Sequence, residues 1–258
     1  MIMDILQEII ANKRKELSAA VEDDSRFIPD TPVRSLKKAL SESGTGIIAE
    51  FKRKSPSKGW IHPDAVPEEV VPAYAAAGAA ALSVLTDADY FGGSLDFIRR
   101  VRPLVDIPIL RKDFIIDARQ LREARGAGAD AVLLIAACLS RGECAALLAE
   151  AHRLGLEVLL EVHGEEELEY ITPEVDVVGV NNRHLGTFVT DVETSFAMAP
   201  LLRARVGEGV PFISESGISD PSTVRKLREE GFSGFLMGEN FMKRPVPGAA
   251  LAEFIDAL

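Results

Sequence analysis

Ionisable and polar side chains follow apolar, strand-like segments at several points of the chain. They are Glu50, Lys52, Lys112, Glu161, Asn181, Glu215 and Ser216. Glu50 and Lys52 are two residues apart, so their side chains point to the same face of a strand. Oppositely charged neighbours in a half-buried site keep each other ionised and adjust their pKa values for acid–base work. The pattern predicts an acid–base site, provided that the fold brings these strand ends together.

A second pattern indicates an anion site. Ser216 and Gly217 follow one apolar segment, and Gly238 follows the next, just before a short helix-like stretch. Glycines let backbone N–H groups approach an anion closely, and a helix N-terminus adds partial positive charge. We therefore expect a phosphate group at these turns, with Lys54 and Arg183 completing the charge balance. Two ordinary turns are the simpler alternative.

Eight short apolar segments are the elements that must position these residues. They lie at 46–52, 80–86, 107–113, 130–136, 156–162, 175–181, 210–216 and 233–238. Most are nearly continuous in apolar residues, as in parallel strands that are buried on both faces. Segments with helical periodicity separate them. Eight alternating units in 258 residues favour a closed (β/α)8 TIM barrel over an open doubly wound sheet. In such a barrel the chemistry belongs at the carboxyl ends of the strands.

Local signals predict where some of the helices begin and end. Ser140, three residues before Glu143, forms a capping-box pattern at the start of a helix over 140–155. Pro72 lies inside another helical segment, which we expect to be short or kinked. Residues 1–45 carry helical patterns at 4–20 and 33–41. We interpret them as an N-terminal helical extension of one barrel domain that spans residues 1–258.

Composition excludes several classes of partner. The formal net charge of −11 argues against nucleic acid and anionic membranes. The first residues lack the apolar core of a signal peptide, and no run reaches the ~18–20 apolar residues of a membrane span.

Cys138 and Cys144 are expected to be reduced, which fits a cytoplasmic protein. The four histidines show no metal-ligand spacing, so no metal is expected.

Eight ordered motifs resemble the indole-3-glycerol phosphate synthase family over nearly the whole chain. They are IIAEFKRKSPSKG, ALSVLTDADYFGGS, PILRKDFIID, GADAVLLIA, EVLLEVH, VGVNNRHL, ISESGIS and GFLMGENFM. The resemblance implies ring closure of 1-(2-carboxyphenylamino)-1-deoxyribulose 5-phosphate with loss of carbon dioxide and water, in tryptophan biosynthesis. It also implies a reaction without cofactor or metal. We expect a monomer.

The resemblance implies a role for each catalytic position. Lys112 is the general acid on the ribulose carbonyl, and Glu161 stabilises the cationic intermediate and assists dehydration. Lys52 pairs with the substrate carboxylate and shuttles a proton, and Asn181 orients the catalytic groups. Glu50, Glu215 and Ser216 complete the catalytic set.

The resemblance also implies a set of binding residues. Phosphate-binding positions are Ser55, Arg183, Gly217 and the backbone at Gly238 and Glu239. Apolar positions around the anthranilate ring are Phe91, Phe114, Leu133 and Leu185. His184 and Glu239 depart from the commonest family pattern. A Glu239 side chain turned inward would repel phosphate, so we expect only its backbone N–H to face the ligand.

Three rival functions remain open from the sequence. A phosphoribosylanthranilate isomerase-like barrel would use a thiol and a carboxylate as its acid–base pair. A Schiff-base aldolase would use one of the lysines as a nucleophile. A non-catalytic phosphate-binding barrel would need only the glycine turns.

Overall fold

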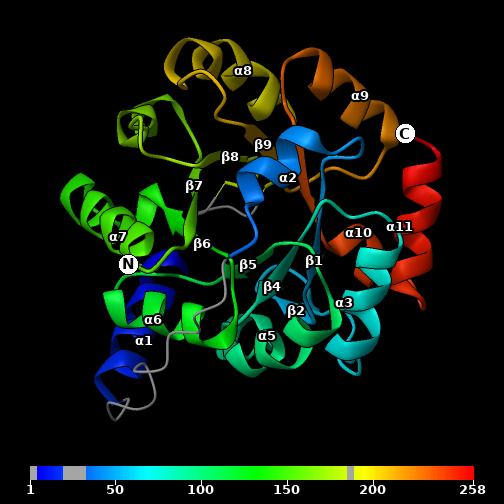
Figure 1. The fold of residues 1–258 in the computed structure, drawn as a ribbon, viewed down its shortest axis with the longest axis horizontal. Coiled ribbons are helices and arrows are strands. Elements are labelled where there is room, and N and C mark those ends of the chain that lie inside the picture. Colours follow the sequence, from blue (N-terminus) through cyan, green and yellow to red (C-terminus); the bar gives the residue numbers. More distant parts are fainter. Residues whose placement is uncertain (1–4, 20–32, 185–188) are drawn as a thin grey trace.

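Eight parallel strands form a closed barrel in the computed structural model, which describes residues 5–19, 33–184 and 189–258 (Figure 1). The strands are β1 (Ile47–Phe51), β4 (Ala81–Leu85), β5 (Ile109–Lys112), β6 (Ala131–Ile135), β7 (Glu157–Val162), β8 (Val177–Asn181), β9 (Phe212–Glu215) and β10 (Gly234–Met237). Each lies within a segment predicted to be a strand. Pairing of β10 with β1, in the register Ile47 to Phe235, closes the ring. The predicted (β/α)8 barrel is confirmed.

Helices surround the barrel and bury the outer faces of the strands (Figure 1). They are α3 (Pro67–Ala76), α5 (Leu95–Val101), α6 (Ala118–Ala127), α7 (Arg141–Arg153), α8 (Glu193–Arg205), α9 (Pro221–Glu229) and α11 (Pro247–Asp256). The predicted capping box of α7 is present, with Ser140 and Glu143 bonded reciprocally. The segment around Pro72 forms a helix of 10 residues, which agrees with a short helix.

The N-terminal extension contributes two helices at opposite ends of the barrel. The helix α2 (Leu36–Glu42) covers the amino-terminal end, where Leu36 and Leu40 join the apolar cluster inside the strands. Ser35 caps α2 and donates its hydroxyl to Glu157, the first residue of β7. The helix α1 (Ile5–Ala19) lies at the other end, because its apolar side chains line the cavity there.

Short elements fill the loops that follow the strands. They are the hairpin β2 (Lys54–Ser55) and β3 (Gly59–Trp60), the helices α4 (Ala88–Phe91) and α10 (Glu239–Met242), and the 3-10 turns η2 (Ala136–Cys138) and η3 (Glu165–Tyr170). A further turn, η1 (Arg102–Leu104), follows α5. Only α10 was expected from the sequence. Within the described residues, no helix is both long and apolar enough to cross a bilayer.

Candidate active site

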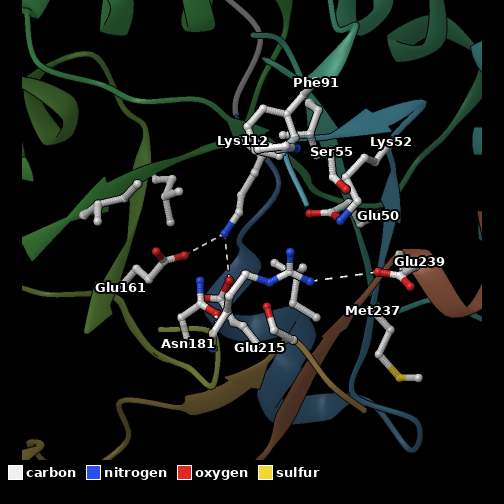
Figure 2. Close-up of a pocket in the computed structure, with 18 of the residues that line it drawn as sticks. Glu50, Lys52, Ser55, Phe91, Lys112, Glu161, Asn181, Glu215, Met237 and Glu239 are labelled. Carbon is white, nitrogen blue, oxygen red and sulfur yellow. Dashed lines mark hydrogen bonds and ion pairs between the residues drawn. The ribbon is translucent and has the colours of Figure 1, made fainter. Parts of the chain in front are cut away.

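One cavity opens at the carboxyl ends of the strands and gathers the residues predicted to do chemistry (Figure 2). All seven predicted catalytic residues line it: Glu50, Lys52, Lys112, Glu161, Asn181, Glu215 and Ser216. Alternate residues of a strand point to opposite faces, so each strand contributes its last inward-facing side chains. These side chains, spread over 167 positions of sequence from 50 to 216, therefore share one solvent-shielded mouth.

Lys112 is the centre of the ionic cluster in this cavity. Its Nζ donates to Oε2 of Glu161 at 2.8 Å and to Oε2 of Glu215 at 2.7 Å (Figure 2). All three side chains are largely buried. Burial opposes the charge on Lys112, but the two carboxylates outweigh burial and hold the pKa of Lys112 above its ordinary value. Lys112 is therefore a stable ammonium and can serve as a proton donor.

The two carboxyl groups of the cluster have different acidities. Burial and the neighbouring Glu161 carboxylate raise the pKa of Glu215 to about 7, against the opposing effect of Lys112. Glu161 is equally buried, but Lys112, His163 and a hydrogen bond with Asn181 lower its pKa. Two close carboxyls that share one ammonium ionise in separate steps. The site can therefore hold an ionised Glu161 beside a protonated Glu215 near neutral pH.

A second ion pair joins Glu50 and Lys52 on β1 and just after it. The Nζ of Lys52 lies 2.5 Å from Oε1 of Glu50, and both side chains are largely shielded from solvent. Gly238 leaves room for this pair, since a Cβ atom there would lie 2.6 Å from Oε1 of Glu50. Gly179 does the same for Glu215, whose Oε1 would lie 2.2 Å from an added Cβ. Glycine on β8 and at the residue that follows β10 is a steric requirement of the buried carboxylates.

The predicted phosphate turns lie beside the ionic cluster. Ser216 and Gly217 both have left-handed backbone conformations, with φ of 69° and 77°. Ser216 is the only residue other than glycine with a positive φ in the described part of the chain. The buried Oγ of Ser55 has no hydrogen-bond partner among the described residues, and it lines the same cavity. A buried hydroxyl without a partner is available to a ligand.

Arg183 supplies the cation near these turns. Its Nη1 donates to Oγ of Ser57 at 2.6 Å, and its Nη2 lies 3.9 Å from Oε2 of Glu239. Gly217, Gly238 and Glu239 line the cavity with it. The Glu239 carboxylate thus lies on the Arg183 side of the site. That only the backbone N–H of Glu239 faces a ligand stays a prediction.

The structure does not bring Lys54 to the cavity, contrary to prediction. The Nζ of Lys54 donates to the carbonyl oxygen of Asp89 at 2.7 Å and lies 5.7 Å from the centre of the Trp60 ring. Lys54 and Ser55 are consecutive in β2, so their side chains point to opposite sides, and Ser55 takes the inner one. The hairpin geometry, which the sequence did not indicate, decides this.

Apolar residues form the other wall. Phe91, Phe114 and Leu133 line it as predicted, and the rings of Phe91 and Phe114 lie 6.1 Å apart. Leu185 lies outside the described residues. Ile5, Leu6 and Ile9 of α1 also line the wall and were not predicted. The sequence shows that residues 4–20 have an amphipathic pattern, but it does not show which surface the helix covers.

A buried ion cluster holds α1 against the loops at the barrel mouth. The Nζ of Lys13 lies 2.9 Å from Oδ2 of Asp87 and 3.1 Å from Oδ1 of Asp113. Asp87 caps α4, which carries Phe91, and Asp113 follows Lys112 directly. One lysine of the extension therefore contacts two of the loops that shape the cavity. None of these three residues was predicted from the sequence to belong to the site.

Asn182 was not among the predicted site residues, since the sequence allowed it to be part of an ordinary turn. Its Nδ2 donates to the carbonyl oxygen of Ser216 and to Oγ of Ser214, both at 3.0 Å. Its Oδ1 accepts from the backbone N–H and the hydroxyl of Ser195. This buried network holds Ser216 in its unusual backbone conformation.

Together, the barrel and its mouth define a (β/α)8-barrel enzyme with an acid–base centre next to a candidate anion site. In the described ranges, no group of three or more His, Cys, Asp or Glu side chains is arranged to hold a metal ion. The family model described as indole-3-glycerol phosphate synthase matches residues 4–254. The chain therefore belongs to the indole-3-glycerol phosphate synthase family, whose activity is that of a carboxy-lyase in tryptophan biosynthesis.

Curated relatives carry the same name. The chain is 57% identical to the indole-3-glycerol phosphate synthase of Bacteroides thetaiotaomicron over 261 residues, which cover 99% of each protein. It is 43% identical to that of Azoarcus sp. over 259 residues, 96% of this chain and 97% of the relative.

Solved structures share the fold. A 3-hexulose-6-phosphate synthase superposes with a TM-score of 0.62 at 17% identity, over 83% of this chain and 99% of that one. The tryptophan synthase alpha subunit of Legionella pneumophila gives 0.62 at 15% identity, over 86% and 98%. At these identities the likeness concerns the barrel alone.

Proposed function

We propose that this chain closes the indole ring of 1-(2-carboxyphenylamino)-1-deoxyribulose 5-phosphate, using the residues that line the barrel mouth. The product is indole-3-glycerol phosphate, and carbon dioxide and water are released. The observation that carries the proposal is the Lys112 ammonium held between Glu161 and Glu215, in a cavity that also contains a candidate anion site.

Ring closure requires an acid at the carbonyl oxygen. The ring carbon that bears the carboxylate attacks the ribulose carbonyl carbon, and the oxygen gains a proton as the carbon–carbon bond forms. Lys112 is the donor, because its neighbours keep it protonated and its Nζ lines the cavity. Positive charge then develops on the nitrogen-bearing ring system. The Glu161 carboxylate stabilises that charge from within the shielded site.

Loss of carbon dioxide restores the aromatic ring, and dehydration follows. In the dehydration step a base removes a proton from the new ring while the hydroxyl leaves as water. After ring closure has used the Lys112 proton, the protonated Glu215, 2.7 Å away and with a pKa of about 7, returns a proton to the Lys112 amine. The ionised Glu161 then takes the ring proton, and the restored Lys112 ammonium, 2.8 Å from Glu161, protonates the leaving hydroxyl. Solvent returns one proton to the site in each cycle. Asn181 orients Glu161 through its hydrogen bond.

Binding orients the reacting atoms. Arg183, Ser55 and the backbone at Gly217 take the phosphate, while Phe91 and Phe114 hold the aromatic ring. Lys52 pairs with the substrate carboxylate from the side of Glu50. Holding both ends of the substrate converts ring closure into an oriented intramolecular step.

The rival chemistries find less support at this site. Neither Cys138 nor Cys144 is among the described residues that line the cavity, so the thiol of an isomerase-type acid–base pair is missing there. A Schiff-base lysine requires a neutral amine, which is favoured by a lowered pKa. The pKa of Lys112 is raised instead.

A direct assay tests the proposal. Purified protein is incubated with the carboxyphenylamino substrate, and indole fluorescence is followed with time. We expect continuous formation of indole-3-glycerol phosphate without added metal or cofactor. Absence of product from folded, substrate-saturated protein would refute the function. Borohydride treatment during turnover should leave no substrate bound covalently to Lys52 or Lys112.

A further inference from the structure

His163 lies behind Glu161 and is not among the described residues that line the cavity. It is two residues after Glu161, so alternation along the extended backbone places both side chains on the same side. Its Nε2 lies 3.4 Å from Oε1 of Glu161, while Lys112 contacts Oε2 of the same carboxylate. One oxygen of Glu161 therefore faces the Lys112 ammonium, and the other faces the His163 imidazole.

Glu167 fixes the other side of the imidazole. Its Oε2 accepts from the backbone N–H of His163 at 2.7 Å and lies 3.2 Å from Nδ1 of the ring. The turn η3 holds Glu167 in place, because Leu168 is buried and the hydroxyl of Tyr170 donates to the carbonyl oxygen of Leu139 at 2.7 Å. A carboxylate at Nδ1 favours a proton on that nitrogen.

The Nε2 atom then decides the charge of the ring. It is buried, has no hydrogen-bond partner among the described residues, and faces a carboxylate oxygen. A bare nitrogen lone pair in that position would repel the oxygen, whereas an N–H attracts it. An imidazolium between Glu167 and Glu161 satisfies both ring nitrogens.

The groups around His163 are mostly anionic. Glu161 of β7, Glu167 of η3 and Glu215 of β9 act on the ring, and the Cys138 thiol of η2 stays neutral because burial and the nearby carboxylates raise its pKa. Lys112 of β5 neutralises part of this charge from the far side of Glu161. Burial opposes protonation of His163, but the carboxylates outweigh it, so its pKa lies above the ordinary value.

We infer that His163 is a positioning residue for Glu161: held as an imidazolium by Glu167, it fixes the Glu161 carboxylate and leaves the shared proton of the carboxyl pair on Glu215. The inference rests on the role of Glu161 in the proposed function. Glu161, His163 and Glu167 then form one chain of contacts, in which only Glu161 touches the substrate. Without the imidazolium, Glu161 and Glu215 would compete for the proton.

The pH profile of kcat tests this inference. Loss of a positive charge beside a carboxylate raises the pKa of that carboxyl. In His163→Gln, the acidic limb of the profile, which reports ionised Glu161, should move to higher pH by roughly 1 unit. Glu167→Gln should move it in the same direction but less far. The matched control is His152→Gln, which removes a histidine paired to Asp176 at 2.8 Å on the outside of the barrel. Its profile should coincide with that of the unchanged chain.

A second measurement is independent of turnover. The chain has four histidines, so nitrogen-15 NMR of the free protein can follow each ring, with single substitutions at the other three identifying His163. We expect both ring nitrogens of His163 to remain protonated at pH 7, and this state to be lost at lower pH in Glu167→Gln than in the unchanged chain. A neutral His163 at pH 7, or a His163→Gln profile that matches the unchanged chain, would overturn the inference. Absence of turnover in the unchanged chain would instead count against the proposed function, while the NMR result would still decide the state of His163.

Discussion

The Nζ atom of Lys112 lies 2.8 Å from Oε2 of Glu161, although the two residues are 49 positions apart. Lys112 ends β5 and Glu161 lies near the end of β7, so the pair spans the intervening strand β6. Contact across a whole strand is possible because both side chains point into the barrel mouth. The pair places the proposed proton donor directly beside the proposed base.

Lys112→Ala should lower kcat by ~10²–10⁴-fold, the usual contribution of a positioned proton donor. The fold should persist, because the two carboxyls left behind can retain a proton. Turnover followed by indole fluorescence and folding followed by circular dichroism would check both points. Lys38→Ala, on an exposed side chain of α2, is the control. Activity of Lys112→Ala within a few-fold of the unchanged chain would remove Lys112 from its role.

Arg183→Ala should chiefly weaken substrate binding. A charged hydrogen bond contributes about 1.5–3 kcal/mol, which corresponds to a rise in KM of roughly 10- to 100-fold. The inhibition constant of inorganic phosphate should rise in parallel, while kcat changes little. Arg141→Ala, on an exposed arginine paired to Glu169, should alter neither constant. An unchanged KM in Arg183→Ala would contradict the phosphate role.

Glu215 should make the stability of the protein depend on pH. Its pKa is about 7 in the folded chain and about 4.5 as an ordinary carboxyl. Between these values the folded state holds a proton that the unfolded state has lost. The free energy of unfolding should therefore fall as the pH rises from about 4.5 to about 7, by at most about 1.4 kcal/mol per pH unit.

Glu215→Gln isolates this contribution, because the amide keeps the shape of the protonated carboxyl. The stability of Glu215→Gln relative to the unchanged chain should increase through the same pH window. Chemical denaturation at several pH values measures it. Glu253→Gln, an exposed residue of α11, serves for comparison. Parallel stability curves for Glu215→Gln and the unchanged chain would show that Glu215 titrates at an ordinary pH.

Gly179→Ala should disturb the ionic cluster through steric contact. The added methyl would lie 2.2 Å from Oε1 of Glu215, so the carboxylate must shift, which changes its 2.7 Å contact with Lys112. We expect lower kcat and a loss of stability of about 1–3 kcal/mol, as for overpacking in a core. Gly142→Ala on α7 meets no atom within 4 Å and should be neutral or slightly stabilising. Equal thermal melts and activities for the two variants would argue against the steric requirement.

Lys13→Met should loosen α1 from the barrel mouth. Removing one partner of a buried ion cluster costs about 3 kcal/mol, since Asp87 and Asp113 lose a cation. Hydrogen exchange should become faster in α1 and remain slow in the barrel strands. KM should also rise, because α1 lines the apolar wall. Lys15→Met, on the exposed face of the same helix, is the matched control. Unchanged exchange in α1 would show that Lys13 does not hold it.

Much of the barrel could be predicted from the sequence, because strands buried on both faces carry a local signal. Each of the eight apolar segments became a strand, and the side chains at their ends line one cavity. Once a parallel barrel is inferred, the strand ends must meet, so Glu50, Lys112 and Glu161 could be grouped without coordinates. The motif resemblance added roles to positions that the periodicity had already grouped.

Contacts between the loops could not be obtained in the same way. The orientation of Lys54 depends on a hairpin of two-residue strands, too short to show alternation in the sequence. The pairing of Lys13 with Asp87 and Asp113 depends on where α1 lies on the barrel. The sequence shows that α1 is amphipathic but not which surface it covers.

The sequence by itself determined the order of strands and helices, the positions of the ionisable residues at the strand ends and the family. The tertiary structure alone decided which atoms meet: Lys112 between Glu161 and Glu215, His163 behind Glu161, and Asn182 under Ser216. The physical reason is that local sequence patterns and tertiary contacts act over different separations along the chain. Periodicity and capping act over a few neighbouring residues, whereas these distances depend on the stagger of separate strands and on the packing of all the elements around them.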